Sequence, residues 1–348
     1  MSLTNFRTLG RSGLVVSPLC LGTMTFGTPR WGSPDEVSAS VFNAYVEAGG
    51  NFLDTADVYA GGRSEELLGG YIADRRLRNQ LVLATKFAFN AQPGNPNAGG
   101  NGRKNIYRAL EGSLRRLRTD YVDMYWLHTW DVVTPVEEVL QTFGDLVRAG
   151  KIRYFGFSNV PAWYATQAAT LASAHAIPGP IALQLEYSLV DRSIEREHVP
   201  AARALGLGIT PWSPLAAGFL AGKYHREDPK ATTDGRLSGP NPFGDQLFTD
   251  RNWRVLDSLR EVATEANLPL AQVALAWAAA QPSMSSLIIG ASKLEQLHDN
   301  LASIEVRLTA DQLQKLDQAS ALDPIYPYPI FSPAVNRGIF GGHTVQGW

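Results

Sequence analysis

The sequence has a single cysteine, Cys20, among its 348 residues, so no intrachain disulfide can form. A long chain without disulfides is typical of a reducing compartment, and we expect a cytoplasmic protein. Excess charge is missing too, because 31 Lys and Arg residues against 33 Asp and Glu residues give a net charge of -2. This balance argues against nucleic acid or an anionic membrane as a partner, since both need a basic surface.

Long apolar runs and clustered metal ligands are also absent from the sequence. No run approaches the ~20 residues of a membrane helix, and the first residues lack the apolar stretch of a signal peptide. The six histidines are scattered, so we expect no metal site. Hydrophobic residues nevertheless make up 45% of the chain, which is enough for a large core.

Short apolar segments alternate with longer amphipathic segments along most of the chain. Continuous apolar runs of this length are typical of parallel strands that are buried on both faces. They lie at residues 19–22, 51–54, 81–86, 122–128, 152–157, 181–185, 208–212 and 286–289. The intervening segments carry helix signals, such as Ser33-Pro34-Asp35-Glu36 before one helix and Gly49-Gly50 after it.

This alternation predicts an α/β fold, a (β/α)8 TIM barrel that forms a single domain over residues 1–348. Gly10 and Gly13 separate two short apolar runs, which predicts an N-terminal hairpin. The doubly wound alternative is disfavoured because no Gly-x-Gly-x-x-Gly motif follows the first strand.

Extra helices and three long segments extend this minimal barrel. The loops at 90–102 and 221–250 each follow a strand, so we expect them at the C-terminal rim. The segment 323–348 is rich in proline and aromatic residues, and we expect this tail to fold over the active site.

Polar side chains stand where several of the predicted strands end. Such positions carry the active sites of TIM barrels. A lysine ammonium lowers the pKa of a nearby tyrosine, a carboxylate holds the lysine, and a histidine orients a substrate oxygen. Each residue alone is more often structural, but their joint placement favours catalysis. The candidates Asp54, Tyr59, Lys86 and His128 predict proton donation to a carbonyl oxygen.

The segments that carry these four residues resemble those of the aldo-keto reductase superfamily, and the resemblance covers nearly the whole chain. Residues 51–59 (NFLDTADVY), 83–86 (LATK) and 125–128 (YWLH) are similar to the family's catalytic segments. The resemblance implies NADP(H) as cofactor and reduction of an aldehyde or ketone to an alcohol by hydride transfer. The implied tetrad is Asp54, Tyr59, Lys86 and His128, with Tyr59 as general acid.

The resemblance also implies a cofactor site. Residues 155–159 (FGFSN) look like the segment that binds the nicotinamide carboxamide, and Trp212 stands where an aromatic residue stacks on the ring. Gly290 stands where some reductases have a basic residue, which leaves Ser292, Lys293 and Gln296 to bind a 2′-phosphate. The implied cofactor-binding residues are Gly22, Thr23, Ser158, Asn159, Gln184, Trp212, Ser213, Pro214, Leu215, Gly218, Gly222, Lys223, Gly290, Ser292, Lys293, Gln296 and Asn300.

Aromatic residues after strands one, three and four predict an apolar substrate pocket, although ordinary packing at the rim is an equal alternative. They are Phe26, Trp31, Phe89 and Trp130. Such walls favour a bulky or aromatic aldehyde or ketone as the small-molecule substrate. The sequence also allows a homo-oligomer.

Two other functions remain open from the sequence. Potassium-channel β subunits are similar to this family, and the resemblance to them implies a regulatory subunit that senses the cofactor. A phosphate-binding barrel isomerase or lyase without nicotinamide is the second alternative, with the glycine-rich segment 218–223 as its phosphate loop.

Overall fold

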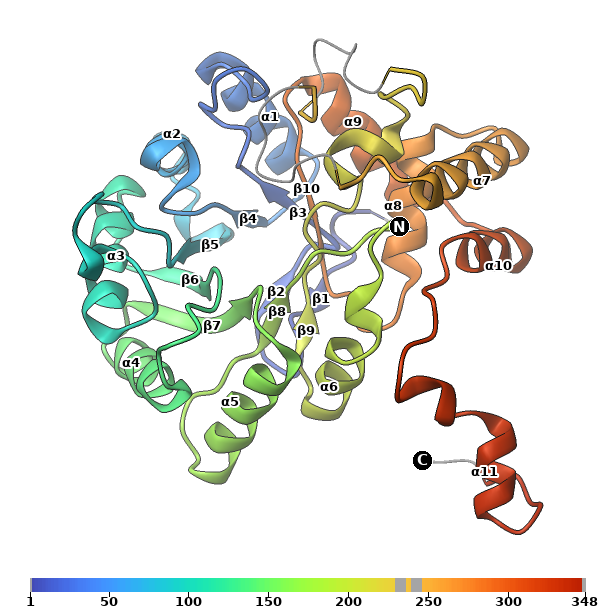
Figure 1. The fold of residues 1–348 in the computed structure, drawn as a ribbon. Coiled ribbons are helices and arrows are strands. Elements are labelled where there is room, and N and C mark those ends of the chain that lie inside the picture. Colours follow the sequence, from blue (N-terminus) through green and yellow to red (C-terminus); the bar gives the residue numbers. More distant parts are fainter. Residues whose placement is uncertain (1, 229–235, 239–245, 346–348) are drawn as a thin grey trace.

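The computed structural model describes residues 2–228, 236–238 and 246–345. Within these residues, eight parallel strands form one sheet in the order β10-β3-β4-β5-β6-β7-β8-β9 (Figure 1). The strands are β3 (Leu19–Gly22), β4 (Phe52–Asp54), β5 (Val82–Phe87), β6 (Val122–Leu127), β7 (Ile152–Ser158), β8 (Ala182–Gln184), β9 (Gly208–Ile209) and β10 (Leu287–Ile289).

Backbone hydrogen bonds close this sheet into a barrel. β10 pairs with β3 on one side. On the other side, Ile209 N donates to Ser283 O at 3.1 Å, and Ile288 N donates to Pro211 O at 2.9 Å. The predicted (β/α)8 barrel is therefore confirmed.

The seventh strand is shorter than the sequence predicts, since β9 ends at Ile209 rather than at Trp212. Pro211 has no N–H to donate, so the regular ladder stops there. Thr210 N and Trp212 N still donate to Leu183 O and Leu185 O at 2.8 and 2.9 Å, which keeps this segment against β8.

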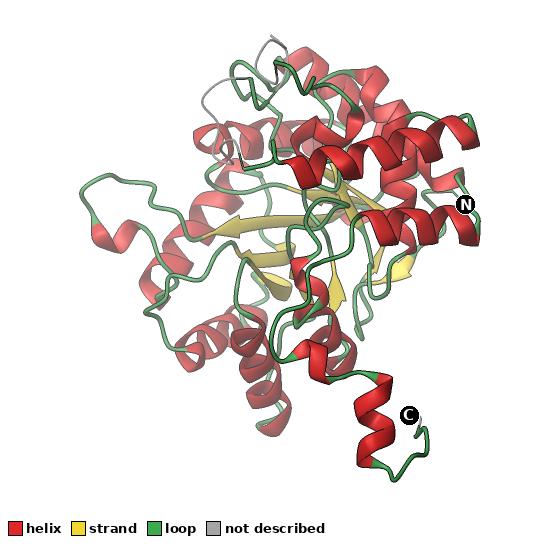
Figure 2. Cartoon of the chain, turned by 45° about the vertical axis from the view of Figure 1, so that its right-hand side comes forward, coloured by secondary structure: helices red, strands yellow, loops and turns green. Residues whose placement is uncertain are grey.

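Helices surround the barrel, as Figure 2 shows. They are α1 (Asp35–Glu47), α2 (Arg63–Asp74), α3 (Arg103–Arg116), α4 (Val136–Arg148), α5 (Ala162–Ala174), α6 (His198–Leu205), α7 (Asp250–Ala266), α8 (Leu270–Ala280), α9 (Leu294–Ala302), α10 (Ala310–Ala319) and α11 (Pro333–Ile339). Two helices, α7 and α8, separate β9 from β10, and α10 packs against α7. These additions confirm the extra helices expected from the sequence.

The N-terminal hairpin is also confirmed. β1 (Arg7–Thr8) pairs antiparallel with β2 (Val15–Val16). Leu9 and Val16 are fully buried and belong to the same cluster as Phe52 and Trp126. The hairpin therefore covers one end of the barrel interior.

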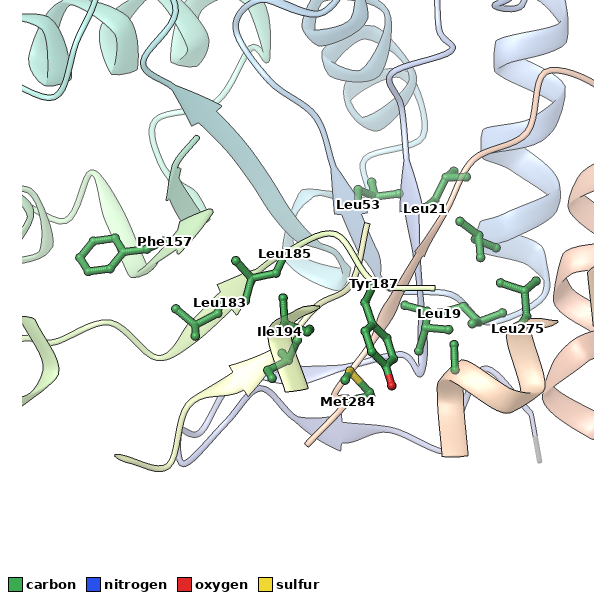
Figure 3. Close-up of a cluster of buried hydrophobic side chains, with 14 of the residues drawn as sticks. Leu19, Leu21, Leu53, Phe157, Leu183, Leu185, Tyr187, Ile194, Leu275 and Met284 are labelled. Carbon is green, nitrogen blue, oxygen red and sulfur yellow. The ribbon is translucent and has the colours of Figure 1, made fainter. Parts of the chain in front are cut away.

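Strand residues alternate between two hydrophobic clusters, as the two-residue period of a strand requires. Phe52 of β4 and Val82 and Ala84 of β5 belong to the interior cluster. Leu53 and Leu83 belong to the larger cluster between the sheet and the helices, part of which Figure 3 shows. Continuing this period places Asp54 and Lys86 on the inner face, at the end of the barrel opposite the hairpin.

The tail does not cover the barrel mouth as the sequence led us to expect. Its described residues begin with an anchor beside α6, where Arg196 Nη2 donates to Asp323 O at 2.8 Å. Tyr328 OH also hydrogen-bonds Glu197. Beyond these contacts α11 projects away from the barrel (Figures 1 and 2). The anchor at the outside of α6 therefore draws the tail away from the mouth.

Two of the expected long loops follow the C-terminal ends of strands, as predicted. The loop after β5 contains a short 3-10 turn at Pro96–Ala98. Residues 229–235 and 239–245 of the segment 221–250 lie outside the described residues. None of the helices in the described parts of the chain is both long and apolar enough to cross a membrane.

Candidate active site

Four predicted catalytic residues meet at the C-terminal end of the barrel. Lys86 is fully buried, and its Nζ donates to the carboxylate of Asp54, to Thr55 O at 2.9 Å and to Tyr59 OH at 3.0 Å. All three ammonium hydrogens thus have acceptors, which holds the amine in one place. Because the phenol oxygen of Tyr59 accepts from Lys86, its own hydrogen is available for a group in the cavity above.

His128 completes this group. Its ring lies edge-on to the ring of Tyr59, with 5.9 Å between the centroids. Burial, and then the positive charge of Lys86, hold the pKa of His128 well below its usual value. The imidazole is therefore neutral at neutral pH.

The pKa of Tyr59 is raised in the structure, whereas the sequence led us to expect that Lys86 would lower it. Burial raises the pKa of Tyr59, and the nearby Lys86 offsets this effect only in part. Burial alone would lower the pKa of Lys86, but Asp54 and Tyr59 raise it above its usual value. Tyr59 is thus a neutral phenol beside a permanent cation, which is the protonation state that a proton donor needs.

Asp54 is held from two sides. One oxygen accepts from Lys86, and the other accepts from Gln184 Nε2 at 2.9 Å. Asp54 and Gln184 are each 2% exposed. Gln184 of β8 therefore fixes the carboxylate that fixes the lysine, a link between strands that are 130 positions apart in the chain.

A cavity of about 870 Å³ opens above these residues. Its volume lies within the ~300–1,000 Å³ range of small-molecule sites. Tyr59, His128 and Asp54 line it, whereas Lys86 lies beneath it. Most of the expected cofactor residues line it as well: Gly22, Ser158, Asn159, Gln184, Trp212, Ser213, Pro214, Leu215, Gly218, Lys223, Gly290, Ser292, Gln296 and Asn300.

Three expected cofactor residues, Thr23, Gly222 and Lys293, do not line the cavity. Thr23 is fully buried, and its hydroxyl donates to Asp54 O at 3.2 Å and shares a hydrogen bond with Ser64. Gly222 ends a 3-10 turn with a φ of 75°, and a Cβ there would lie 2.7 Å from Leu270. Lys293 precedes the first turn of α9.

Hydrogen bonds shape the cavity wall. Asn159 Nδ2 donates to His128 O at 2.9 Å, and Asn159 Oδ1 accepts from Trp212 Nε1 at 3.2 Å. Asn159, Ser213 and Ala217 have φ values of 49°, 56° and 54°. Such left-handed conformations of non-glycine residues are strained, and they concentrate at functional sites.

The four expected substrate residues divide into two pairs. Trp31 and Phe89 line the cavity, and the ring of Phe89 lies 5.0 Å from that of His128. Phe26 is instead fully buried in the core, while Trp130 packs against Trp163 with 5.4 Å between the ring centroids. Phe26 and Trp130 therefore do not line the cavity, because packing against other side chains takes up both rings.

Arg236 is a lining residue that the sequence did not reveal. Its guanidinium carbon lies 4.4 Å from the ring centroid of Trp31, and Nη2 lies 3.3 Å from Met24 Sδ. Burial lowers the pKa of Arg236 to about 10. It comes from a loop without periodic pattern, so no sequence signal placed it near the tetrad.

No group of three or more residues suited to metal binding occurs in the part of the chain that the structure describes.

Comparisons with known proteins agree with this geometry. The model of the Aldo/keto reductase family matches residues 18–321. A probable voltage-gated potassium channel subunit beta of Oryza sativa is 37% identical over 317 residues, covering 90% of this chain and 95% of that protein. The uncharacterized oxidoreductase YrpG of Bacillus subtilis is 35% identical over 332 residues, covering 92% and 95%.

A norsolorinic acid reductase of Aspergillus flavus is 31% identical over 325 residues, covering 91% of this chain and 81% of that protein. None of these three relatives is named as an isomerase or a lyase. The family match spans the barrel strands and all four residues of the tetrad. The chain therefore belongs to the aldo/keto reductase family.

Proposed function

We propose that this protein uses NADPH to reduce the carbonyl group of an aldehyde or ketone to an alcohol, with Tyr59 as the general acid. The observation that carries the proposal is the 3.0 Å hydrogen bond between Lys86 Nζ and Tyr59 OH, at the wall of a cavity that His128 also lines. The family match and the reductases among the relatives support carbonyl reduction.

The residues present fit a dinucleotide. The cavity wall runs from the tetrad on β4, β5 and β6 to Ser292, Gln296 and Asn300 beside α9. Trp212 offers an aromatic face next to Asn159, and Lys223 is a cationic residue of the wall. A Cβ at Gly290 would meet no atom within 4 Å, so this part of the wall has open space beside the backbone.

In this proposal Asn159 and Gln184 bind the carboxamide of the nicotinamide and Trp212 packs on its ring. The segment from Ser213 to Gly218 and Lys223 bind the pyrophosphate. When bound, NADPH supplies the hydride. The protein positions the substrate and donates a proton from the Tyr59 hydroxyl.

Tyr59 and His128 hold the substrate oxygen in the proposed reaction. The neutral imidazole of His128 orients the carbonyl, and the Tyr59 hydroxyl gives its proton as negative charge develops on that oxygen. Lys86, held by Asp54 and Gln184, stabilises the phenolate that remains. A positioned general acid contributes typically ~100- to 10,000-fold in rate.

The Tyr59→Phe variant tests this proposal. We expect NADPH-dependent reduction to fall by at least ~100-fold, the lower bound for a general acid. Binding of NADPH, followed by quenching of tryptophan fluorescence, should remain. Tyr121→Phe is the matched control, because the hydroxyl of Tyr121 lies at an exposed site near Asn79. Retained turnover in Tyr59→Phe would refute the assignment.

We also propose a bulky or aromatic carbonyl substrate. Trp31 and Phe89 line the mouth, and Phe89 lies against His128. The norsolorinic acid reductase and an aryl-alcohol dehydrogenase of Pestalotiopsis microspora, 31% identical over 321 residues, are named for aromatic compounds. A panel of aryl and short aliphatic aldehydes and ketones tests this point, and equal kcat/KM for both groups would contradict it.

The preference for NADPH over NADH rests on Ser292, Lys293 and Gln296. Ser292 Oγ donates to Gln296 Oε1 at 3.2 Å, so these two side chains share one edge of the cavity. Lys293→Ala should raise the KM for NADPH more than that for NADH. An equal change in the KM for NADPH and for NADH would contradict a 2′-phosphate site at Lys293. The expectation of a cytoplasmic location goes with this proposal and rests on the single buried cysteine.

A second candidate function is a regulatory subunit that senses the bound nucleotide. The rice relative and one from Arabidopsis thaliana, 35% identical over 327 residues, carry the name of a potassium channel subunit. Rapid multiple turnover with a good substrate favours the enzyme. A single slow turnover with retained nucleotide favours the regulatory subunit.

A further inference from the structure

Exposed apolar side chains are concentrated in the tail. Of the fifteen large hydrophobic residues that are exposed in the described parts of the chain, eight lie between positions 325 and 345. They are Ile325, Tyr326, Ile330, Phe331, Val335, Ile339, Phe340 and Val345, with exposed fractions from 39% to 83%. At ~150–250 Å² for a large buried side chain, this is roughly 800 Å² of apolar surface.

The helix in this tail buries none of its side chains against the described parts of its own chain. α11 has seven residues, and none of them is buried. Isolated helices shorter than ~12–15 residues are marginal in water even with favourable sequences. A helix of this length with Val335 and Ile339 facing solvent therefore indicates a packing surface outside the chain to which it belongs.

A surface of matching character lies on the outside of the barrel. α5 and α6 border a groove of about 430 Å³, lined by Trp163, Thr166, Thr170 and Leu171 among others. α5 contains no charged residue along its 13 positions. Trp163 is 56% exposed at the edge of this groove. A surface helix normally carries charged residues on its outer face, and α5 has none.

The tail starts at the rim of the same groove. Glu197 lines the groove and hydrogen-bonds Tyr328, and its neighbour Arg196 donates to Asp323 O at 2.8 Å. From this anchor α11 leads away from the barrel (Figure 2). If α11 of each copy occupied the groove of the other, the two contacts would be identical and related by a two-fold axis, which is the self-complementary arrangement of a symmetric dimer.

We propose that two copies of this chain exchange their tails, and that α11 of each copy packs into the α5–α6 groove of the other. Two tails would contribute on the order of 1,600 Å² of apolar surface before the receiving surfaces are counted. A standard stable interface buries ~1,600 Å² in total. The exchange therefore accounts for the exposed tail residues, for the folded state of α11 and for the uncharged outer face of α5.

Cross-linking between two single-cysteine variants of the full chain tests the exchange. Cys20 is buried, so an introduced cysteine is the accessible thiol. Ile339→Cys places a thiol on α11, and Thr166→Cys places one in the groove. After the two proteins are mixed and allowed to re-equilibrate, a short bis-maleimide should link them into a covalent heterodimer. The control pair, Val133→Cys with Thr166→Cys, should give no more than background linkage.

Two results would overturn the proposal. One is the absence of heterodimer from the mixture, together with efficient linkage within a single chain that carries both Ile339→Cys and Thr166→Cys. That result would show that the tail folds back onto its own groove. The other is the absence of linkage in either experiment, which would show that the groove does not receive the tail.

Mass in solution provides an independent measurement. The unmodified chain should sediment as a dimer, and Phe331→Glu should shift it toward the monomer because a charge at the buried interface opposes association. Val133→Glu is the matched control, because Val133 is 79% exposed on a different loop. A monomeric unmodified chain at all accessible concentrations, or an unchanged dimer in Phe331→Glu, would contradict the exchange. Neither position lines the active-site cavity, so turnover reports whether the variants are folded.

Discussion

Removing the ammonium of Lys86 should lower both the stability of the protein and its activity, for different reasons. Two variants, Lys86→Met and Lys86→Met with Asp54→Asn, distinguish the two effects. Lys86→Met keeps much of the aliphatic stem but leaves the Asp54 carboxylate without its cation. Asp54 is 2% exposed, and its remaining partner is Gln184. The substitution therefore leaves a buried carboxylate with one hydrogen bond where the original protein has an ion pair.

The magnitude follows from this geometry. Breaking one partner of a buried ion pair costs about 3–5 kcal/mol, because the other charge remains uncompensated. The donor from Gln184 retains part of the stabilisation of Asp54, so we expect the lower half of this range. Adding Asp54→Asn to Lys86→Met removes the uncompensated charge and should recover most of the lost stability.

Denaturant unfolding, followed by tryptophan fluorescence, measures these free energies. A double-mutant cycle with Asp54→Asn alone gives the coupling between the two side chains. Activity should respond differently, since both Lys86→Met and the double variant lack the cation that stabilises the Tyr59 phenolate. If the double variant is no more stable than Lys86→Met, the buried charge is not the cause of the loss, and the reasoning is refuted.

Three further predictions concern Asp57, His128 and Trp212. Burial raises the pKa of the Asp57 carboxyl to about 7, with Glu65 adding to the rise. The folded state therefore holds a proton that the unfolded state releases above ~4, and stability is lost as pH rises from ~4 to 7; Asp57→Asn should flatten this dependence in unfolding experiments. The pKa of His128 is held well below its usual value, so the unfolded state binds the proton first, and stability falls as pH drops below ~6.5 by up to ~1.4 kcal/mol per pH unit. His128→Gln should remove this acid sensitivity, and an NMR titration that shows the ring protonating at pH 6.5 would contradict the assignment. Trp212→Ala should weaken nucleotide binding in a fluorescence titration and lower stability little, because Trp212 lies at the cavity wall and not in the core; unchanged affinity would exclude stacking there.

The barrel and the four residues Asp54, Tyr59, Lys86 and His128 could be predicted from the sequence because they depend on local patterns. Each buried parallel strand is a short apolar run. Asp54 and Lys86 lie at the ends of two such strands and His128 directly follows a third, whereas Tyr59 lies in a 3-10 turn after β4. Once Val82 and Ala84 face the barrel interior, the two-residue period of a strand directs Lys86 to the same face. The same period places Asp54 above Phe52, so the meeting of amine and carboxylate follows from strand pattern and barrel closure together.

Exposure and long-range contact are not local properties, and here the sequence was a poor guide. Phe26 and Trp130 have the same aromatic character as Trp31 and Phe89, yet packing removes the first pair from the cavity mouth. Arg236 belongs to an irregular loop, and only the folded chain brings it over Trp31. The rise in the pKa of Tyr59 depends on how deeply the phenol is buried, which spacing along the chain does not encode.

By itself, then, the sequence determined the class of fold, the identity of the four side chains that meet and the end of the barrel where they gather, because these depend on periodicity and residue type. The tertiary structure alone decided which aromatic rings reach the cavity, that Gln184 braces Asp54, and that the tail leaves the mouth open. These outcomes depend on packing between segments far apart in the chain, where many arrangements satisfy the same local pattern and burial selects one of them.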